Sequence, residues 1–134
     1  MSTDDLIEAA PMCFACGPDN PIGLQIKFTL ANERVTAQFT PDKNHVGYEN
    51  TVHGGIIYSA LDDVMANCLY LQQIKAHTAR CEIRYRKALQ VGQTINLSGW
   101  IETRKRRLVI LKSEARLADG DELIADCEAS FMLA

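Results

Sequence analysis

The sequence predicts an α+β fold in which an antiparallel sheet curls around one long helix. Three observations predict it. Strand-like alternation of apolar and polar residues occupies both ends of the chain, a long apolar stretch with helical spacing separates them, and the chain is 134 residues long. A chain of this length buries a substantial core but has little room for a second one, so we expect a single domain over residues 1–134.

The first expected element is a hairpin that precedes the helix. Apolar and polar residues alternate over residues 24–30 and again over residues 35–39, with a turn near Asn32 between them. A polar loop over residues 42–50 follows Pro41. We therefore expect two strands with one buried face, then a loop that leads into the helix.

The second expected element is a helix from about Gly54 to about Gln73. Its apolar residues recur at intervals of three and four, which is the period of a helix that packs one face against a core. The stripe is wide because further apolar residues flank it, so the helix should be largely buried. The stripe and its flanks consist of Ile57, Tyr58, Ala60, Leu61, Val64, Met65, Cys68, Leu69 and Leu71.

Four more strands are expected after the helix. Alternating patterns cover residues 81–86, 95–101, 109–111 and 123–133. Turn signals separate them at Val91-Gly92 and at Asp119-Gly120. This half of the chain should supply most of the sheet that wraps the helix.

His53-Gly54-Gly55 at the start of the helix has a clear chemical use. The first turn of a helix has backbone N–H groups without internal acceptors and the positive end of the helix dipole, and glycine lets a ligand approach closely. A carbonyl oxygen that gains negative charge could be held there. The motif therefore suggests acyl transfer.

The two adjacent carboxylates of the helix are not equivalent. At about 100° per residue, Asp62 lies beside the apolar Tyr58 and Met65, whereas Asp63 lies on the more polar side with Ser59. An acid among apolar groups is inclined to hold a proton and suits a general base or nucleophile. We expect Asp62 to be the functional acid and Asp63 to be solvated.

Helical geometry also separates Asp62 from its own glycines. Nine residues after His53, Asp62 lies about 13 Å along the axis from the Gly-Gly turn and on roughly the opposite side of the helix. One chain therefore cannot bring both to one substrate. A second chain with an antiparallel helix could, and would create two equivalent sites in a twofold dimer.

Composition and charge exclude several functions. The net charge of −3 and the isoelectric point of about 5.6 argue against nucleic acid as a partner. Residues 1–5 lack the pattern of a signal peptide, and we expect no membrane-spanning segment and a cytoplasmic location.

The five cysteines are an odd number without secretory features, which fits reduced thiols. Cys13-Phe-Ala-Cys16 has the spacing of a zinc or redox pair, but the sequence contains no second pair to complete four ligands, and a run of turn residues follows it. We expect a loop that packs two small thiols, with no metal; zinc and redox roles remain alternatives.

His53-Gly54-Gly55 followed by Asp62, with Gly47-Tyr48 before it and a strand-rich second half, resembles the hotdog-fold acyl-CoA thioesterases of the phenylacetyl-CoA type. The segment from Cys13 to Gly17 and on to Leu24 resembles a subgroup of that family. The resemblance in element order covers nearly the whole chain. It implies a hotdog fold and hydrolysis of a thioester at the interface of a homodimer, which could pair further into a homotetramer.

The resemblance also implies roles for individual residues. The N–H of Gly54 or Gly55 would polarise the thioester carbonyl, Asp62 of the other subunit would activate water or attack directly, and His53 would support this end of the site. Coenzyme A would be bound as part of the substrate, with no other cofactor. The residues expected to bind substrate are Asn50, Tyr58, Asp63, Met65, Arg84, Arg86, Lys87 and Arg106.

Two alternatives share the fold. A protein that binds acyl-CoA without catalysis would show saturable binding and thermal stabilisation but no turnover. A hydratase or dehydratase would need acid and base groups at the α- and β-carbons of the substrate, and the sequence contains no convincing His/Asp pair for that role.

Overall fold

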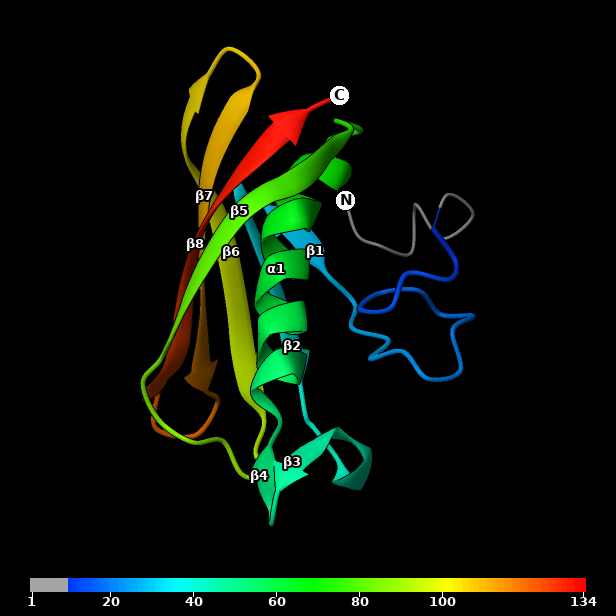
Figure 1. Ribbon diagram of the computed structural model, residues 1–134, viewed down its shortest axis with the longest axis vertical. Helices are drawn as coiled ribbons and strands as arrows, with labels where there is room; N and C mark the ends of the chain where they lie inside the picture. Colours follow the sequence, from blue (N-terminus) through cyan, green and yellow to red (C-terminus); the bar gives the residue numbers. More distant parts are fainter. Residues whose placement is uncertain (1–9) are drawn as a thin grey trace.

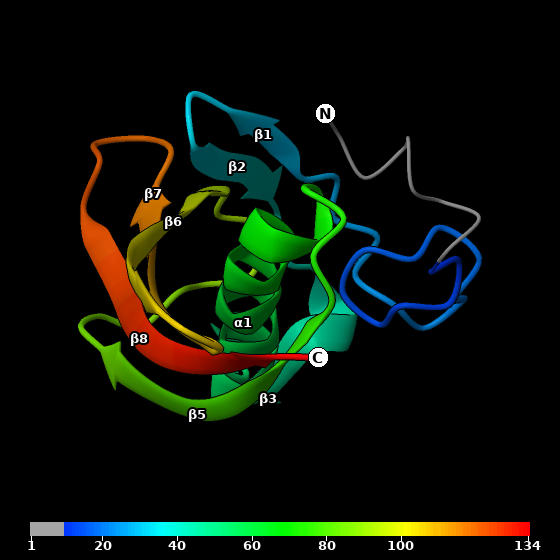
Figure 2. The same cartoon turned by 90° about the horizontal axis from the view of Figure 1, so that it is seen from above.

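The computed structural model describes residues 10–134. A six-stranded antiparallel sheet curves around one long helix, as Figures 1 and 2 show. This confirms the predicted α+β class and the hotdog architecture. In chain order the elements are β1 (Thr29–Ala31), β2 (Arg34–Phe39), η2 (Lys43–His45), β3 (Val46–Tyr48), β4 (Thr51–Val52), α1 (Gly54–Tyr70), β5 (Ala76–Tyr85), β6 (Ile95–Lys105), β7 (Leu108–Leu117) and β8 (Leu123–Leu133).

The strands of the large sheet have the spatial order β1-β2-β6-β7-β8-β5. The strand that follows the helix therefore lies at one edge of the sheet, and the hairpin that precedes the helix lies at the other. Within the described residues, β5 pairs only with β8, over residues from Ala76 to Tyr85. One backbone edge of a ten-residue strand is thus unpaired in the single chain.

The concave face of the sheet and helix α1 enclose the hydrophobic core. The helix contributes the fully buried Leu61, Val64 and Met65, and the sheet covers them with side chains such as Leu97 and Leu111. Gly99 on β6 allows the close approach, because a Cβ there would lie 3.1 Å from the carbonyl oxygen of Val64. The stripe predicted from the sequence is the buried face of this helix.

Several predicted boundaries differ from the structure; β5, for example, begins at Ala76 rather than at Cys81. The helix ends at Tyr70 rather than near Gln73, because Gln73 has a left-handed backbone (φ 63°) and the Ile74 N–H turns back to the carbonyl of Leu69. The first predicted strand enters the sheet only at Thr29. Residues 24–28 keep the alternating burial but leave the sheet edge, and their backbone N–H groups bond the loop that contains Cys13 and Cys16.

The segment before the helix also contains an unpredicted feature. Strand β3, in the expected loop over residues 42–50, pairs with β4 just after it in a small separate hairpin. No helix within residues 10–134 is long and apolar enough to cross a membrane. The expectation that residues 1–5 do not form a signal peptide concerns a segment outside the described residues.

Candidate functional site

Helix α1 begins at the glycine pair, and His53 caps it. The ring Nδ1 of His53 accepts a hydrogen bond from the Gly55 N–H at 2.8 Å. An accepting Nδ1 carries no proton, so in the neutral ring the proton lies on Nε2. No group among the described residues accepts a hydrogen bond from the Gly54 N–H. The Gly54 N–H is therefore the donor that remains available to a ligand at this helix end.

A side chain of the edge strand β5 also contacts the start of helix α1. The Tyr85 hydroxyl donates a hydrogen bond to the Gly54 carbonyl at 2.8 Å, and a Cβ on Gly54 would lie 3.2 Å from that hydroxyl. Glycine at position 54 thus leaves room for Tyr85. This contact ties the start of the helix to the end of β5.

Asp62 lies in the middle of the helix and also faces β5. The Thr78 hydroxyl donates a hydrogen bond to Asp62 Oδ1 at 2.9 Å. Burial raises the pKa of the Asp62 carboxyl above its usual range, and the Thr78 hydrogen bond partly offsets that rise. A half-buried carboxylate with one hydrogen-bond donor can accept a proton, which is what a general base requires.

The two groups remain separate within one chain. Eight residues along one helix correspond to about 12 Å of rise between Gly54 and Asp62. Each is held by a different end of β5, Gly54 by Tyr85 and Asp62 by Thr78. A single chain thus presents two half-sites along the unpaired strand.

Asp63 lies on another side of the helix and is not solvated. Its carboxylate oxygens lie 3.8 and 3.9 Å from Cys13 Sγ, and Asn67 Nδ2 donates to Asp63 Oδ2 at 3.2 Å. Burial raises the pKa of Asp63 to about 7. The prediction that Asp63 is solvated is therefore wrong, while its predicted role in substrate binding stays a prediction. The loop that contains Cys13 and Cys16 covers this face of the helix, which helical geometry alone could not reveal.

The two thiols beside Asp63 differ from each other. Hydrogen bonds, chiefly from Cys16, lower the pKa of Cys13 to about 5. The same interaction and burial raise the pKa of Cys16. The two sulfur atoms and a carboxylate oxygen of Asp63 all lie within 4.8 Å of one another.

Three of the other predicted substrate-binding residues have distinct surroundings. Tyr58 is half-buried, and interaction with Cys81 on β5 raises the pKa of its hydroxyl. Met65 is fully buried in the core, so its predicted contact with substrate is not available in this conformation. Asn50 lies in the β3–β4 turn, where its carbonyl accepts from the Val91 N–H. Tyr58 and Met65 both lie on the Asp62 side of the helix, but of the two only Tyr58 is partly exposed.

The predicted basic residues lie at both ends of the sheet. Arg86 forms a bidentate ion pair with Asp126, and Lys87 pairs with Glu122. Arg84 lines a shallow outer depression with three acidic side chains, Glu82, Asp126 and Glu128. Arg86 and Lys87 are thus committed to ion pairs.

The cluster over residues 104–107 is different, because it surrounds the exposed β6–β7 turn. The Arg107 guanidinium donates to the Leu133 carbonyl, while Arg104, Lys105 and Arg106 form no ion pair within residues 10–134. Strand register aligns Leu108 with Met132 and Met132 with His77, so this turn lies at the Thr78 end of β5.

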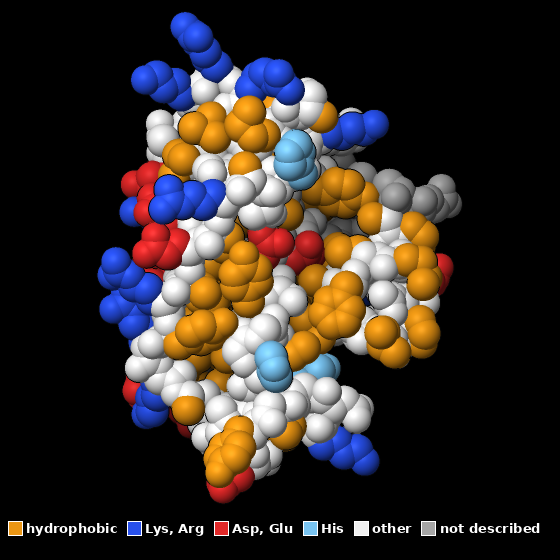
Figure 3. Space-filling model, in the orientation of Figure 1, with side chains coloured by type: hydrophobic (Ala, Val, Ile, Leu, Met, Phe, Trp, Pro, Cys, Tyr) orange, Lys and Arg blue, Asp and Glu red, His pale blue; other side chains and the backbone are white. Residues whose placement is uncertain are grey.

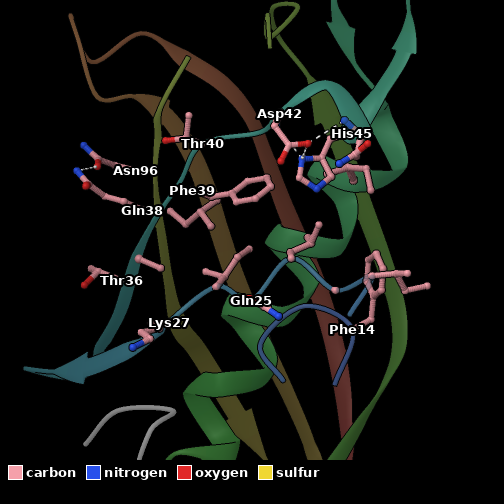
Figure 4. A pocket seen from close by; sticks show the side chains of 18 of the residues that line it. Phe14, Gln25, Lys27, Thr36, Gln38, Phe39, Thr40, Asp42, His45 and Asn96 are labelled. Carbon is pink, nitrogen blue, oxygen red and sulfur yellow. Dashed lines mark hydrogen bonds and ion pairs between the residues drawn. The ribbon is translucent and has the colours of Figure 1, made fainter. Parts of the chain in front are cut away.

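A depression of about 1550 Å³ lies between strand β2 and the segment over residues 21–29, and it is lined by neither Gly54 nor Asp62. Figure 4 shows its wall, with Thr36, Gln38 and Phe39 of β2 facing the segment that contains Gln25. The cavity forms because residues 24–28 diverge from the β2 edge. Its volume alone does not make it the site of chemistry.

The molecular surface shows where polar and apolar groups gather. In Figure 3, acidic side chains lie in the middle of one face among hydrophobic ones, between the helix-and-sheet body and the lobe formed by the N-terminal loop. Lys and Arg side chains gather at the periphery, including the end where Figure 1 shows the β6–β7 turn. The hydrophobic face is therefore bordered by positive charge.

Comparison with known proteins identifies the family. The family model of the thioesterase superfamily matches residues 49–124, which is more than half of the chain and includes the glycine pair and Asp62. The chain belongs to the thioesterase superfamily. A search of the curated proteins finds no match to this sequence.

Solved structures of thioesterase superfamily proteins share the fold. Zebrafish thioesterase superfamily member 2 superimposes with a TM-score of 0.83 at 16% identity, covering 100% of this chain and 99% of that one. The Escherichia coli PaaI protein of the phenylacetic acid degradation operon has a TM-score of 0.75 at 16% identity, over 81% and 83% of the two chains. A hypothetical thioesterase from Streptococcus pneumoniae, solved with coenzyme A, has a TM-score of 0.74 at 12% identity, over 79% and 82%.

Sequence reasoning missed Thr78 and Tyr85, which hold the two half-sites. Both fall in the strand after the helix, and their side chains face the helix as Cys81 and Ile83 do. Alternation could have assigned Tyr85 to the inward face with Cys81 and Ile83, but it would have put Thr78 on the outer face, because a register irregularity between Thr78 and Arg80 shifts the pattern. It could not have shown which helix residues these hydroxyls reach, because that depends on where the strand crosses the helix.

Proposed function

We propose that this protein is an acyl-CoA thioesterase whose site is completed by a second copy of the chain. The observation that carries the proposal is that both half-sites lie along β5, the unpaired edge of the sheet. An exposed edge of ten residues is a template for pairing with another strand. The structure of the Streptococcus pneumoniae relative with coenzyme A supports a CoA ester as the substrate class.

Pairing through β5 would bring complementary half-sites together. If two β5 strands pair antiparallel about their midpoint, the Thr78 end of one lies beside the Tyr85 end of the other. Thr78 holds Asp62 and Tyr85 holds Gly54. Each Asp62 then approaches the helix N-terminus of the partner subunit, and the dimer contains two equivalent sites.

The proposed reaction is general-base hydrolysis. Asp62 accepts a proton from a water molecule, and the water oxygen attacks the thioester carbonyl carbon. The Gly54 N–H of the other subunit and the helix dipole stabilise the oxyanion that forms. When the oxyanion collapses, the carbon–sulfur bond breaks, the thiolate of coenzyme A leaves, and the proton held by Asp62 neutralises a product.

The same arrangement assigns a role to the basic turn. Arg104, Lys105 and Arg106 lie at the Thr78 end of the sheet and are not committed to ion pairs within residues 10–134. We propose that they contact the phosphates of coenzyme A. Arg86 and Lys87, which were expected to share this role, are instead paired with the carboxylates of Asp126 and Glu122, and Arg84 lies at the opposite end of β5 from this turn.

The proposal is tested with a panel of aliphatic and aryl acyl-CoAs, using wild type, Asp62→Asn and the control Asp119→Asn at the exposed β7–β8 turn. Loss of a general base predicts a fall in kcat of roughly 10²–10⁴-fold for Asp62→Asn. Asp119→Asn should match wild type. Full activity of Asp62→Asn would contradict the mechanism, and saturable acyl-CoA binding without turnover by wild type would identify a binding protein instead.

A further inference from the structure

The loop with Cys13 and Cys16 forms a second chemical cluster, separate from the proposed thioester site. Two thiols from the loop and the Asp63 carboxylate from helix α1 present three ligand atoms that all lie within 4.8 Å of one another. Cys13 Sγ lies 3.8 Å from Asp63 Oδ1. Thiolate and carboxylate are ligand types that Zn²⁺ accepts, at bond lengths near 2.3 and 2.0 Å.

The loop is built to hold the two sulfur atoms on one side. The Gly17 N–H bonds the Cys13 carbonyl at 2.7 Å, and the Cys16 N–H lies 3.4 Å from Cys13 Sγ. Gly17 cannot be another residue without a shift, because a Cβ there would lie 2.3 Å from the Cys13 nitrogen. The Asn20 side chain links the two ends of the loop, because its Nδ2 donates a hydrogen bond to the Met12 carbonyl and its Oδ1 accepts one from the Ile22 N–H. The CxxC pair is therefore part of a fixed turn.

Asn67 provides an independent indication that something else binds here. It lies one helical turn after Asp63, is only 2% exposed, and lines the same depression of about 330 Å³ as Cys13, Cys16 and Asp63. Its Nδ2 donates to the carbonyl and carboxylate of Asp63, yet its Oδ1 has no hydrogen-bond partner. An unsatisfied buried acceptor is destabilising, and a metal ion or a metal-bound water in the depression would remove that cost.

We propose that Cys13, Cys16 and Asp63 bind one Zn²⁺ ion, with the fourth position taken by a water that donates to Asn67 Oδ1 or by that oxygen itself. Binding releases the thiol protons, so two thiolates and a carboxylate surround a divalent cation. Four-coordinate zinc with mixed sulfur and oxygen ligands matches this donor set. Hard cations such as Mg²⁺ would not select two sulfur ligands.

The site would give the N-terminal loop a structural role. Residues 14 and 15 already pair with residues 24 and 26 through backbone hydrogen bonds, and the ion would fasten this unit to helix α1 beside Asp62. The proposal does not depend on thioester hydrolysis, because zinc binding and turnover are measured separately. The sequence alone indicated only two possible ligands, Cys13 and Cys16, and therefore predicted no metal.

The experiment is to express the full chain in zinc-supplemented medium, purify it without chelator under reducing conditions, and measure zinc and free thiols per chain. Wild type should contain about one zinc per chain, and Cys16→Ser and Asp63→Asn should lose most of it. Asp62→Asn and Cys81→Ser are the matched controls, since each removes the same kind of group outside the cluster, and both should retain zinc.

A cobalt-substituted sample of unmodified protein provides a readout that does not depend on the folding of any variant. A thiolate-to-cobalt charge-transfer absorption, together with a rise in Tm when zinc is added to apoprotein, would support the site. Background zinc and no cobalt–thiolate absorption in wild type would overturn it. So would equal loss of zinc in Asp62→Asn and Asp63→Asn, or purification of Cys13 and Cys16 as a stable disulfide that excludes metal.

Discussion

Asp62 and Asp63 are consecutive residues, yet they face two different parts of the molecule. Asp62 meets a hydroxyl on the edge strand β5, and its carboxylate is half-buried beside the helix face that a second copy would cover. Asp63 meets two thiols and an amide beneath the N-terminal loop. The first lies beside the open edge of the sheet, where we propose that a second subunit binds, and the second is covered by a loop of its own chain.

The difference shows how a rotation of about 100° along a helix can give two consecutive side chains entirely different neighbours. Both carboxyl groups have pKa values raised by burial. The elements that bury the two carboxyl groups differ, however. Asp62 lies against β5, which is an open edge of the sheet, whereas Asp63 lies under the loop over residues 10–26. A raised pKa alone therefore does not identify the catalytic acid, and the geometry of the neighbours must decide.

The largest effect should come from combining two inactive chains. Asp62→Asn removes the base, and Gly54→Pro removes the proposed oxyanion donor. Proline is favoured at the first helical position, and His53 already has an extended backbone (φ −59°, ψ 131°). The added Cβ would lie 3.2 Å from the Tyr85 hydroxyl, so that side chain must also shift by a few tenths of an ångström. Differently tagged chains are co-expressed and the hybrid dimer is purified through both tags. One of its two sites combines both defects and the other has neither, so we expect about half of wild-type activity.

This experiment separates shared sites from sites within one chain. Each single-mutant dimer serves as the control and should be nearly inactive. If the hybrid is as inactive as its parents, Asp62 and Gly54 act within one chain. The proposal that the Asp62 side of the helix forms a site shared between two subunits would then be wrong. A monomeric but active wild type would have the same consequence.

The sequence predicted the element order, the buried stripe of the helix and the hairpin turn at Asn32, because each depends on local periodicity and turn chemistry. Asn32 and Glu33 have positive φ angles of 52° and 63° where the turn was expected. The helix start at Gly54 was also readable, since His53 and two glycines stand where a cap and an exposed first turn were needed.

What the sequence could not supply were contacts between distant segments. Thr78 reaches Asp62 across 16 residues and Cys13 reaches Asp63 across 50 residues. Helical geometry correctly placed Asp63 on a different side of the helix from Asp62. That side is not exposed to solvent, however, because a loop that is distant in sequence covers it. The zinc hypothesis was weak for the same reason, since the third ligand and the orphan acceptor of Asn67 are far from the CxxC motif.

The next largest effect should follow from Gly17→Ala, which acts on the Asp63 side only. The added Cβ would lie within 2.6 Å of backbone atoms of Pro11 and Cys13, so the loop must rearrange, at a cost of about 2–3 kcal/mol. Denaturant unfolding should show this loss, and limited proteolysis should open the loop. Gly92→Ala, which meets no neighbour within 4 Å but has φ 91°, controls for backbone strain and should cost only about 1 kcal/mol. Equal losses would mean that the loop is not tightly held.

The smallest effect is expected from Thr78→Val, which tests whether the Asp62 side is as sharply ordered as the Asp63 side. Valine keeps the shape of threonine but removes the hydroxyl that orients Asp62 Oδ1 at 2.9 Å. A hydrogen bond to a charged group contributes about 1.5–3 kcal/mol. If about half of this stabilisation is lost in the transition state, kcat should fall about tenfold. Thr103→Val on the exposed end of β6 is the matched control. Because Thr78 touches Asp62 and not the ligand, KM should change less than kcat. An unchanged kcat would mean that water or the partner subunit orients Asp62, and a raised KM alone would make Thr78 a substrate contact instead.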